Sequence, residues 1–400
     1  MKACLFFLIL LADMSFAQSI PTPDPAWTFR TRGAIYGSPL AVDNVVYFGS
    51  TDSTLYAVDL PTGKLKWQRK VGGPLKATPC TGSGPLLYVT GGDGVCYAVE
   101  RATGSVRWRF NTLGGILGER KYDFADYHHS SPVLQGDTLL FGSGDGRLYA
   151  LDARTGKPFW SYQTHDIVHS TPAIYAGKVF VSSFDGHLYA LHLRDGSLAW
   201  KFKSVGHRYF PKGEMQGSPV AGNGLIYVGS RDYNLYALDA QSGFGHWNRA
   251  FPQGWAMALT ALDTVLYVGT SDDKVLAALD GRTGRELWRT NLKFNIFGGS
   301  AFDPTSVYVG TLMGRVFGLD RKTGAIRWVF TTEGSRLNRN RYFKSDDTFR
   351  DDIRTVIRSY DDFLVMYERL GAMFSAPALA GNRLLVGSAD GTIYCLKLGP

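Results

Sequence analysis

The side chains best suited to chemistry lie in one short segment, ERKYDFADYHHSSP, which runs from position 119 to 132. Asp126, His128 and His129 are close together in it, and imidazoles with a carboxylate can bind a transition metal or an anionic ligand. His169 precedes a proline by three residues, as His129 does, so we expect both imidazoles on one rim of the fold. The spacing matches no established metal motif, however. The alternative interpretation is that these residues pack beneath the segment at the rim and bind no ligand.

Two further polar residues, His207 and Asp166, are expected in loops of the same face. Other catalytic signatures are missing from the sequence, which contains no G-x-S-x-G, no H-E-x-x-H and no phosphate-binding glycine loop. The sequence therefore names ligand-binding candidates and no catalytic residue, and the metal, if one binds, stays unidentified.

The elements that must position these residues come from an internal repeat of about forty residues. A stretch similar to L-Y-A-L-D-x-x-T-G-x-x-x-W occurs seven times, and an eighth copy from Ile393 lacks its tryptophan. Each copy combines short alternating strands with Gly- and Asp-rich turns, which is typical of antiparallel β-meanders. Four strands per copy and eight copies predict an all-β fold, an eight-bladed β-propeller.

The missing outer strand of the eighth repeat is expected from the other end of the chain. Trp27 lies twelve residues before Pro39, which is also the spacing from Trp67 to Pro79. The segment WTFRT around Trp27 should therefore complete blade eight and close the ring, which removes the open sheet edges.

The repeated residues have a structural interpretation. The glycine of each T-G pair suits a turn with positive φ, and the aspartate before it can accept hydrogen bonds from turn amides. The tryptophans can dock between neighbouring blades, with the indole N–H on a backbone carbonyl; they are Trp27, Trp67, Trp108, Trp160, Trp200, Trp247, Trp288 and Trp328.

On these residues the chain resembles the pyrroloquinoline-quinone-type (PQQ-like) propeller repeat, with its tryptophan-docking motif A-x-D-x-x-T-G-x-x-x-W, from Trp27 to Leu398. The resemblance implies one of two functions. One branch holds quinone-dependent dehydrogenases, which would use PQQ with calcium; the other holds non-enzymatic BamB-like scaffolds of outer-membrane assembly. The chain has no adjacent cysteine pair, which the dehydrogenases commonly carry over the quinone, and it is shorter than they usually are. We therefore expect no cofactor.

Three insertions interrupt the repeat, at about residues 111–128, 203–215 and 331–373, each between the outer strand of one blade and the inner strand of the next. Successive turns of a meander alternate faces, so all three should elaborate one face, where binding residues concentrate. In the largest, apolar residues at three-and-four spacing from Asp347 to Gly371 predict an amphipathic helix of about six turns. Arg350, Arg354 and Arg358 lie between its apolar positions. The helix either packs on the propeller or forms a lid or docking surface.

Residues 1–17 read as a signal peptide, with Lys2 before an apolar run and small residues at the cleavage positions Ser15 and Ala17. Residues 18–400 would then be the propeller, a periplasmic or secreted protein without a membrane span and with no lipoprotein anchor evident. Cys80, Cys96 and Cys395 are scattered among strands and predict buried thiols, not disulfides. The net charge of +8 is spread over turns of every blade and does not favour nucleic acid.

These features favour an exported, monomeric, non-enzymatic scaffold that binds a protein partner in the cell envelope. The alternative is a small PQQ- or metal-dependent oxidoreductase that uses the insertion-bearing face of the central channel.

Overall fold

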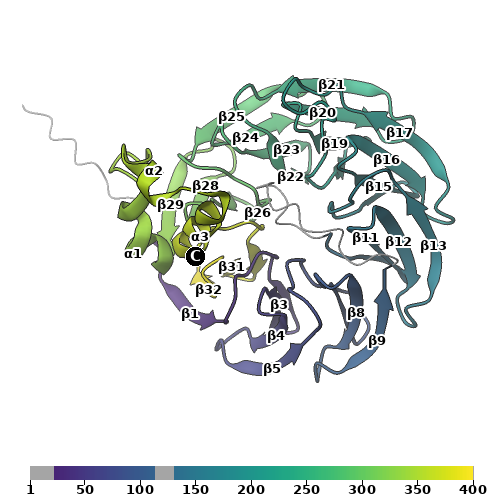
Figure 1. The fold of residues 1–400 in the computed structure, drawn as a ribbon, viewed down its shortest axis with the longest axis horizontal. Coiled ribbons are helices and arrows are strands. Elements are labelled where there is room, and N and C mark those ends of the chain that lie inside the picture. The colour runs from purple at the N-terminus through teal and green to yellow at the C-terminus, as the bar shows by residue number, and fades with distance from the viewer. Residues whose placement is uncertain (1–21, 113–129, 400) are drawn as a thin grey trace, which may run out of the picture.

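The computed structural model describes residues 22–112 and 130–399. Eight four-stranded antiparallel sheets form a ring, with the helices over one part of it (Figure 1). The expected eight-bladed β-propeller is confirmed. Each blade runs from an inner strand near the centre to an outer strand at the periphery, and strands adjacent in the sequence are paired in each sheet.

The first four blades are continuous in sequence. Blade one contains β2 (Leu40–Val42), β3 (Val45–Ser50), β4 (Thr54–Asp59) and β5 (Leu65–Lys70); blade two contains β6 (Cys80–Thr81), β7 (Leu86–Thr90), β8 (Val95–Glu100) and β9 (Val106–Asn111); blade three contains β10 (Val133–Gln135), β11 (Thr138–Gly142), β12 (Arg147–Asp152) and β13 (Pro158–Gln163); blade four contains β14 (Ala173–Tyr175), β15 (Lys178–Ser182), β16 (His187–His192) and β17 (Leu198–Lys203).

The remaining blades follow the same plan until the last. Blade five contains β18 (Val220–Gly222), β19 (Leu225–Gly229), β20 (Asn234–Asp239) and β21 (Gly245–Ala250); blade six contains β22 (Ala256–Leu262), β23 (Val265–Thr270), β24 (Val275–Asp280) and β25 (Glu286–Asn291); blade seven contains β26 (Ala301–Phe302), β27 (Ser306–Gly310), β28 (Arg315–Asp320) and β29 (Ile326–Thr331); blade eight contains β30 (Ala378–Ala380), β31 (Arg383–Gly387), β32 (Thr392–Lys397) and, from the N-terminal side, β1 (Pro25–Arg30).

The ring closes through β1, as expected from the position of Trp27. β1 pairs antiparallel with β32, and the register places Trp27 opposite Cys395 and Arg30 opposite Thr392 (Figure 1). Two segments more than 360 residues apart in sequence thus form one ladder, which covers the edge of β32 that would otherwise be open.

The two middle strands of each blade form the core. Every residue of β3 is buried, because both faces of its sheet are covered by neighbouring blades. Outer strands such as β5 bury only alternate residues, so they alternate between half-buried and exposed side chains.

The tryptophans dock between blades. Seven indole Nε1 groups donate to a backbone carbonyl of the next blade, at 2.8 to 3.3 Å: Trp27 to Leu60, Trp67 to Arg101, Trp108 to Ala153, Trp160 to Leu193, Trp200 to Ala240, Trp247 to Gly281 and Trp288 to Arg321. Each indole also lies against the glycine of the turn between the third and fourth strands of that blade, which follows Thr in five blades, Asp in blade four and Ser in blade five. Gly104, for example, has φ +71°, and an added Cβ would be 2.6 Å from the Trp67 ring. Glycine is thus required there for conformation and for space.

The inner strands are joined near the channel by hydroxyl groups. The amide of Ser38 donates to Thr78 Oγ1 at 2.9 Å, and the amide of Thr78 donates to Ser131 Oγ at 3.0 Å. The amide of Thr171 likewise donates to Ser218 Oγ at 2.9 Å. Blade-to-blade hydrogen bonds therefore line the inner side of the ring as well as its periphery.

The expected helical insertion between blades seven and eight is confirmed, but it contains three helices, so the single continuous helix expected from Asp347 is wrong. The helices are α1 (Glu333–Tyr342), α2 (Ile353–Val356) and α3 (Tyr360–Leu370). Ser359 and Asp362 form a capping box that starts α3, which breaks the apolar periodicity after the short α2. The expected end at Gly371 is confirmed, since this residue is left-handed with φ +63°.

Cys80, Cys96 and Cys395 are free thiols, as expected; Cys96 and Cys395 are also buried as expected, whereas Cys80 is half-buried. Within the described residues, no helix combines the length and apolar character that crossing a bilayer requires.

We predict that Gly104→Ala destabilises the ring more than Gly136→Ala. Both glycines have positive φ, +71° and +58°, so both substitutions strain the backbone, but nothing lies within 4 Å of a Cβ at Gly136. At Gly104 the methyl must displace the Trp67 indole and its hydrogen bond, which costs about 2 kcal/mol more. Urea unfolding of both variants measures the difference, and equal losses would contradict the docking role.

Candidate partner-binding face

The two described insertions lie on one face of the ring, together with the turns between second and third strands. Gly186, in such a turn of blade four, is so close to the insertion at 203–215 that an added Cβ would be 1.9 Å from the Lys212 carbonyl. Gly314, in the same turn of blade seven, approaches the Leu370 carbonyl at the end of α3 in the same way. We call this the insertion face. The expectation that 203–215 and 331–373 share a face is confirmed.

The apolar side of the helices covers the rim of the channel. Tyr36, Phe297 and Phe374 occupy the same position in their repeats, four residues before the first residue of the inner strands β2, β26 and β30. All three are buried. The Phe374 ring centroid lies 5.0 Å from that of Tyr36, 6.3 Å from that of Phe297 and 5.9 Å from that of Tyr367 in α3. Met366 and Leu370 of α3 belong to the same cluster. The apolar side of the insertion therefore packs on the propeller, which was one of the two expectations.

A carboxylate with two arginine partners fixes the insertion to blade seven. We call Asp347 with Arg315 and Arg339 the Asp347 clamp. Asp347 accepts hydrogen bonds from Arg315 of β28, at 2.6 and 3.0 Å from its two terminal nitrogens, and from Arg339 Nε of α1 at 2.7 Å. Burial acts to raise the pKa of Asp347, but the hydrogen bonds and charges of the two guanidinium groups outweigh it and hold the pKa below its usual value. The Asp347 side chain is 13% exposed, so solvent screens this contact little.

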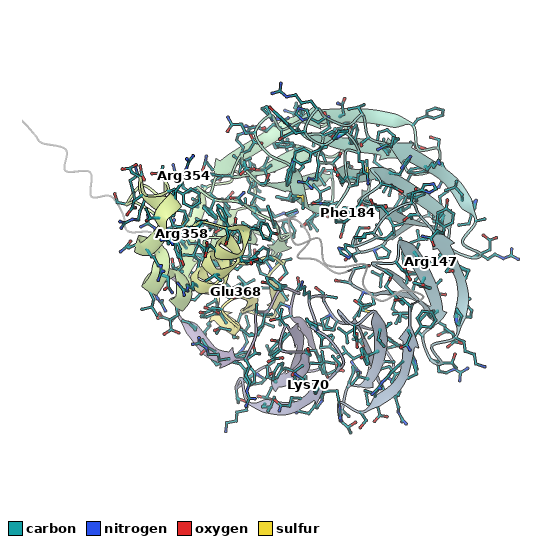
Figure 2. The ribbon with its side chains drawn as sticks, viewed as in Figure 1. Lys70, Arg147, Phe184, Arg354, Arg358 and Glu368 are labelled. Carbon is teal, nitrogen blue, oxygen red and sulfur yellow. The ribbon has the colours of Figure 1, made fainter. Side chains whose placement is uncertain are left out.

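The arginines expected to bind a partner lie on the solvent side of the insertion. Arg350 forms a two-pronged ion pair with Asp352, at 2.8 Å for each contact, and Arg358 Nε donates to the Thr355 carbonyl at 3.0 Å. Arg354 is exposed on α2, and Figure 2 shows Arg354 and Arg358 in the helical region at one side of the ring. Of the three side chains, Arg354 alone has no hydrogen-bond partner among the described residues.

The expected histidine site is only partly described. Asp126, His128 and His129 lie outside the described residues. His169 is buried, with its ring 5.5 Å from that of Phe184, while His207 packs against Tyr233 at 4.8 Å. Asp166 pairs with Lys212 at 3.0 Å. The described part of the chain brings no three His, Cys, Asp or Glu side chains together in metal-binding geometry.

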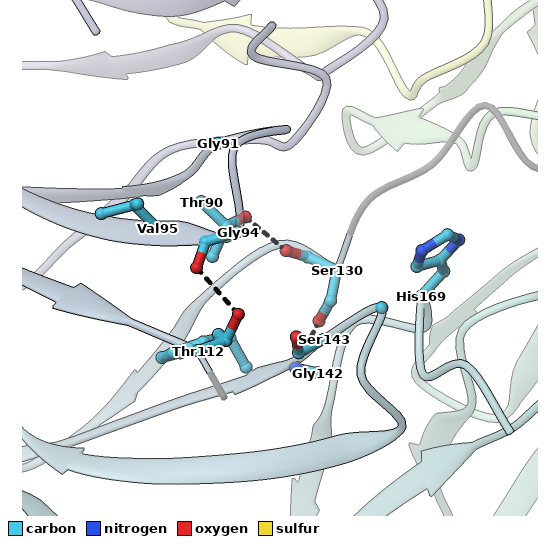
Figure 3. A pocket seen from close by; sticks show the side chains of 11 residues that line it. Thr90, Gly91, Gly94, Val95, Thr112, Ser130, Gly142, Ser143 and His169 are labelled. Carbon is cyan, nitrogen blue, oxygen red and sulfur yellow. Dashed lines mark hydrogen bonds between the residues drawn. The ribbon is translucent and has the colours of Figure 1, made fainter. Parts of the chain in front are cut away.

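His169 lines a small cavity between blades two and three (Figure 3). Its volume is about 40 Å³, which suits a water molecule or two. The hydroxyl groups in its lining are held by internal hydrogen bonds: Thr90 Oγ1 donates to the Ser130 carbonyl at 2.7 Å, and Ser130 Oγ accepts from the Gly142 amide at 2.8 Å.

The sequence also contains a signal for the covered blade that the repeat pattern alone does not reveal. In six blades an aspartate of the second turn accepts from a tyrosine hydroxyl four residues later, as in Tyr56 to Asp52 at 2.7 Å and Tyr149 to Asp145 at 2.6 Å. Burial and this hydrogen bond raise the pKa of Tyr56 to about 12. Blade seven reads GTLMGRVFGLD, and its Leu312 and Met313 are buried against the helices. Blade seven thus lacks both the aspartate and the tyrosine of this hydrogen bond, and this absence identifies the turn that the helices cover.

Sequence comparison groups the chain with a known family and with a full-length relative. The model of the family described as outer membrane protein assembly factor BamB matches residues 17–92, 51–122, 92–213 and 209–347. BamB of Burkholderia pseudomallei is 26% identical over 417 residues, which span 98% of this chain and 96% of that protein. Tetrathionate hydrolase of Acidithiobacillus ferrooxidans is 25% identical over 343 residues, 74% of this chain and 68% of that protein.

Among solved structures, BamB from Moraxella catarrhalis superposes with a TM-score of 0.68 at 18% identity. The match covers 94% of this chain and 100% of that chain. At this identity the likeness shows a shared fold.

We predict that Asp347→Asn lowers the free energy of unfolding by about 2 kcal/mol at neutral pH, because two guanidinium groups lose their carboxylate. Since the folded pKa of Asp347 is depressed, its contribution is complete above the unfolded pKa of about 3.9 and disappears as pH falls through the folded pKa. The wild type and the variant should therefore converge in acid.

The control is Asp351→Asn, because Asp351 pairs with Lys344 at 2.7 Å but is 92% exposed. It should cost less than about 0.5 kcal/mol. Urea unfolding across the acid range measures the free energy of unfolding of all three proteins. If the difference in this free energy between the wild type and Asp347→Asn does not change with pH, the Asp347 clamp is excluded.

Proposed function

Since this chain belongs to the family described as outer membrane protein assembly factor BamB, we propose that it is a protein-binding scaffold of the cell envelope, and that it serves outer-membrane protein assembly. The observation that carries the proposal is the similarity to a BamB over nearly the full length of both chains. Because fold alone does not determine function, the proposal also needs a surface on this chain that is suited to binding a protein.

The insertion face supplies that surface. A scaffold needs a surface whose shape does not change when a partner binds, since a rigid surface loses little conformational entropy on binding. The apolar cluster under α3 and the Asp347 clamp hold the helices on the ring from two sides. The solvent side then presents Leu337, 75% exposed on α1, and the accessible Arg354 on α2. We assign partner binding to this side of the helices.

The proposal includes location and assembly state. Residues 1–17 would direct export and be removed, so that the propeller acts in the periplasm or outside the cell as a monomer. N-terminal sequencing of the mature protein and sedimentation analysis test these two parts separately.

We predict that Leu337→Glu and Arg354→Glu each weaken binding to the barrel-assembly complex purified from the same organism by about tenfold or more. Exposed leucine and arginine side chains of an interface act through packing and charge, and both changes reverse that chemistry. The control is Arg282→Glu, an exposed residue in a turn between third and fourth strands, on the opposite face. Biolayer interferometry measures the affinities. Unchanged binding by both helix variants would remove the helices as the docking surface.

A PQQ-dependent oxidoreductase is the second candidate, favoured by the PQQ-type repeat and by the similarity to an enzyme, tetrathionate hydrolase. The described rim of the channel that would receive a flat quinone is filled on one side by Tyr36, Phe297 and Phe374 beneath α3. We propose that the scaffold functions without a cofactor.

We predict that PQQ, with or without calcium, causes no saturable change in the absorbance of the quinone or in the melting temperature of the mature protein. A ligand that binds only the folded state stabilises it, and the stabilisation grows with ligand concentration. A specific quinone site would therefore raise the melting temperature as the PQQ concentration increases. A saturable rise, lost in His169→Ala, would put the oxidoreductase ahead of the scaffold.

A further inference from the structure

A tight hairpin projects from the insertion between blades four and five. His207 and Phe210 form a two-residue β-bridge, with the His207 amide donating to the Phe210 carbonyl at 3.0 Å and the Phe210 amide donating to the His207 carbonyl at 2.9 Å. Arg208 and Tyr209 are the two residues of the turn between them. Gly206, with φ +74°, lets the chain enter the hairpin close to Pro211. We call residues 205–212 the hairpin loop.

The base of the hairpin loop is held by aromatic packing. The Phe210 ring meets Trp255 edge to face, with centroids 5.3 Å apart, and the guanidinium of Arg231 lies 4.1 Å from the Phe210 centroid and 4.5 Å from the Trp255 centroid. His207 packs against Tyr233 at 4.8 Å. Edge-to-face aromatic and cation–π contacts of this kind fix the direction in which the turn points.

The tip carries apolar side chains in solvent. Val205 is 79% exposed and Tyr209 is 65% exposed. Large exposed apolar side chains of the described chain fall into two groups: one lies along the outer strands and their turns, and the other lies on the two described insertions. The outer group is Leu65, Phe159, Leu198, Phe244 and Leu287, and the insertion group is Val205, Tyr209, Leu337, Phe349 and Val365.

Cationic side chains lie beside the exposed apolar side chains of the hairpin loop. Arg208 lies 4.4 Å from the Tyr209 ring centroid and has no carboxylate partner among the described residues. Lys203 and Lys212 flank the loop, and Lys212 pairs with Asp166 at 3.0 Å while Lys203 Nζ donates to the Asp185 carbonyl at 3.1 Å. The charge that is left uncompensated at the tip is thus positive, on a chain with a net charge of +8.

We propose that the hairpin loop docks on an anionic lipid bilayer, with Val205 and Tyr209 entering the headgroup region and Arg208 contacting lipid phosphates. The tip offers two exposed apolar side chains, Val205 and Tyr209, whose combined area is far less than the roughly 800 Å² per partner of a stable protein interface. A membrane needs only an apolar wedge with adjacent cations, and tyrosine suits the boundary because one end of it is apolar and the other polar. The inference goes beyond the proposed scaffold function and stands apart from any protein partner.

The test is sedimentation of the full-length mature protein with vesicles. Vesicles of phosphatidylglycerol mixed equally with phosphatidylcholine should bind the wild type at low salt, with weaker binding at high salt, and vesicles of phosphatidylcholine alone should bind far less. Arg208→Glu should weaken binding at least about fivefold, because each cation near an anionic surface contributes roughly that factor. Val205→Ser and Tyr209→Ser should each weaken it by about tenfold.

The matched control is Phe244→Ser, since Phe244 is 78% exposed but belongs to the outer-strand group. This variant should bind vesicles as the wild type does. Absence of wild-type binding to anionic vesicles at low salt, equal binding to both kinds of vesicle, or hairpin variants that bind normally would each overturn the proposal. Loss of protein-partner binding in Tyr209→Ser with no vesicle binding by the wild type would also overturn it and assign the loop to a protein interface. Failure of the scaffold function would leave the vesicle result unaffected.

Discussion

The contact between a tryptophan of one blade and a turn glycine of the next is the constraint on which the ring depends. The indole can lie flat and donate to a carbonyl of the neighbouring blade only if the turn has positive φ and no Cβ, as at Gly104 beneath Trp67. The contact holds neighbouring blades together, and it is present at seven of the eight junctions of the ring. Inner-strand hydroxyls such as those of Thr78 and Ser131 repeat the same connection near the channel.

One seam of the ring is built differently. Blade eight takes its outer strand from β1, so no turn joins that strand to β32. In the described chain no turn glycine of the next blade lies against Trp328, whereas one lies against each of the other seven docking tryptophans. The helices cross this seam. Thr332 Oγ1 donates to the Leu370 carbonyl at 2.8 Å, and the first amide of α1, on Glu333, donates to the Tyr394 hydroxyl of blade eight at 3.1 Å. The largest insertion therefore connects blades seven and eight where the turn contact is absent, which also explains why its apolar side is buried.

The fold could be predicted from the sequence because its signals are local and repeated: glycine, aspartate and tryptophan recur at fixed spacing, and the position of Trp27 alone showed how the ring closes. The helical insertion could be predicted only in part. Its apolar periodicity continues through Ile353 and Val356 into α3, and the break comes from the Ser359–Asp362 capping box, a local signal that periodicity does not register. The clamp at Asp347 was not predictable, because Arg315 comes from another element 32 residues away and meets it only in the folded ring. Charge spacing similarly indicated Arg350, Arg354 and Arg358, but only the structure shows that Arg350 and Arg358 already have partners within the insertion.

We propose that the ring presents the helices of residues 331–373, on its insertion face, to a protein partner. Hydrogen–deuterium exchange of the mature protein, alone and with the barrel-assembly complex of the same organism, tests it most directly. We predict that exchange slows in α1 and α2 on binding, and that exchange is unchanged in the turns between third and fourth strands, such as the one at Gly284 on the opposite face. Protection confined to those opposite turns, or to the outer strands, would contradict it.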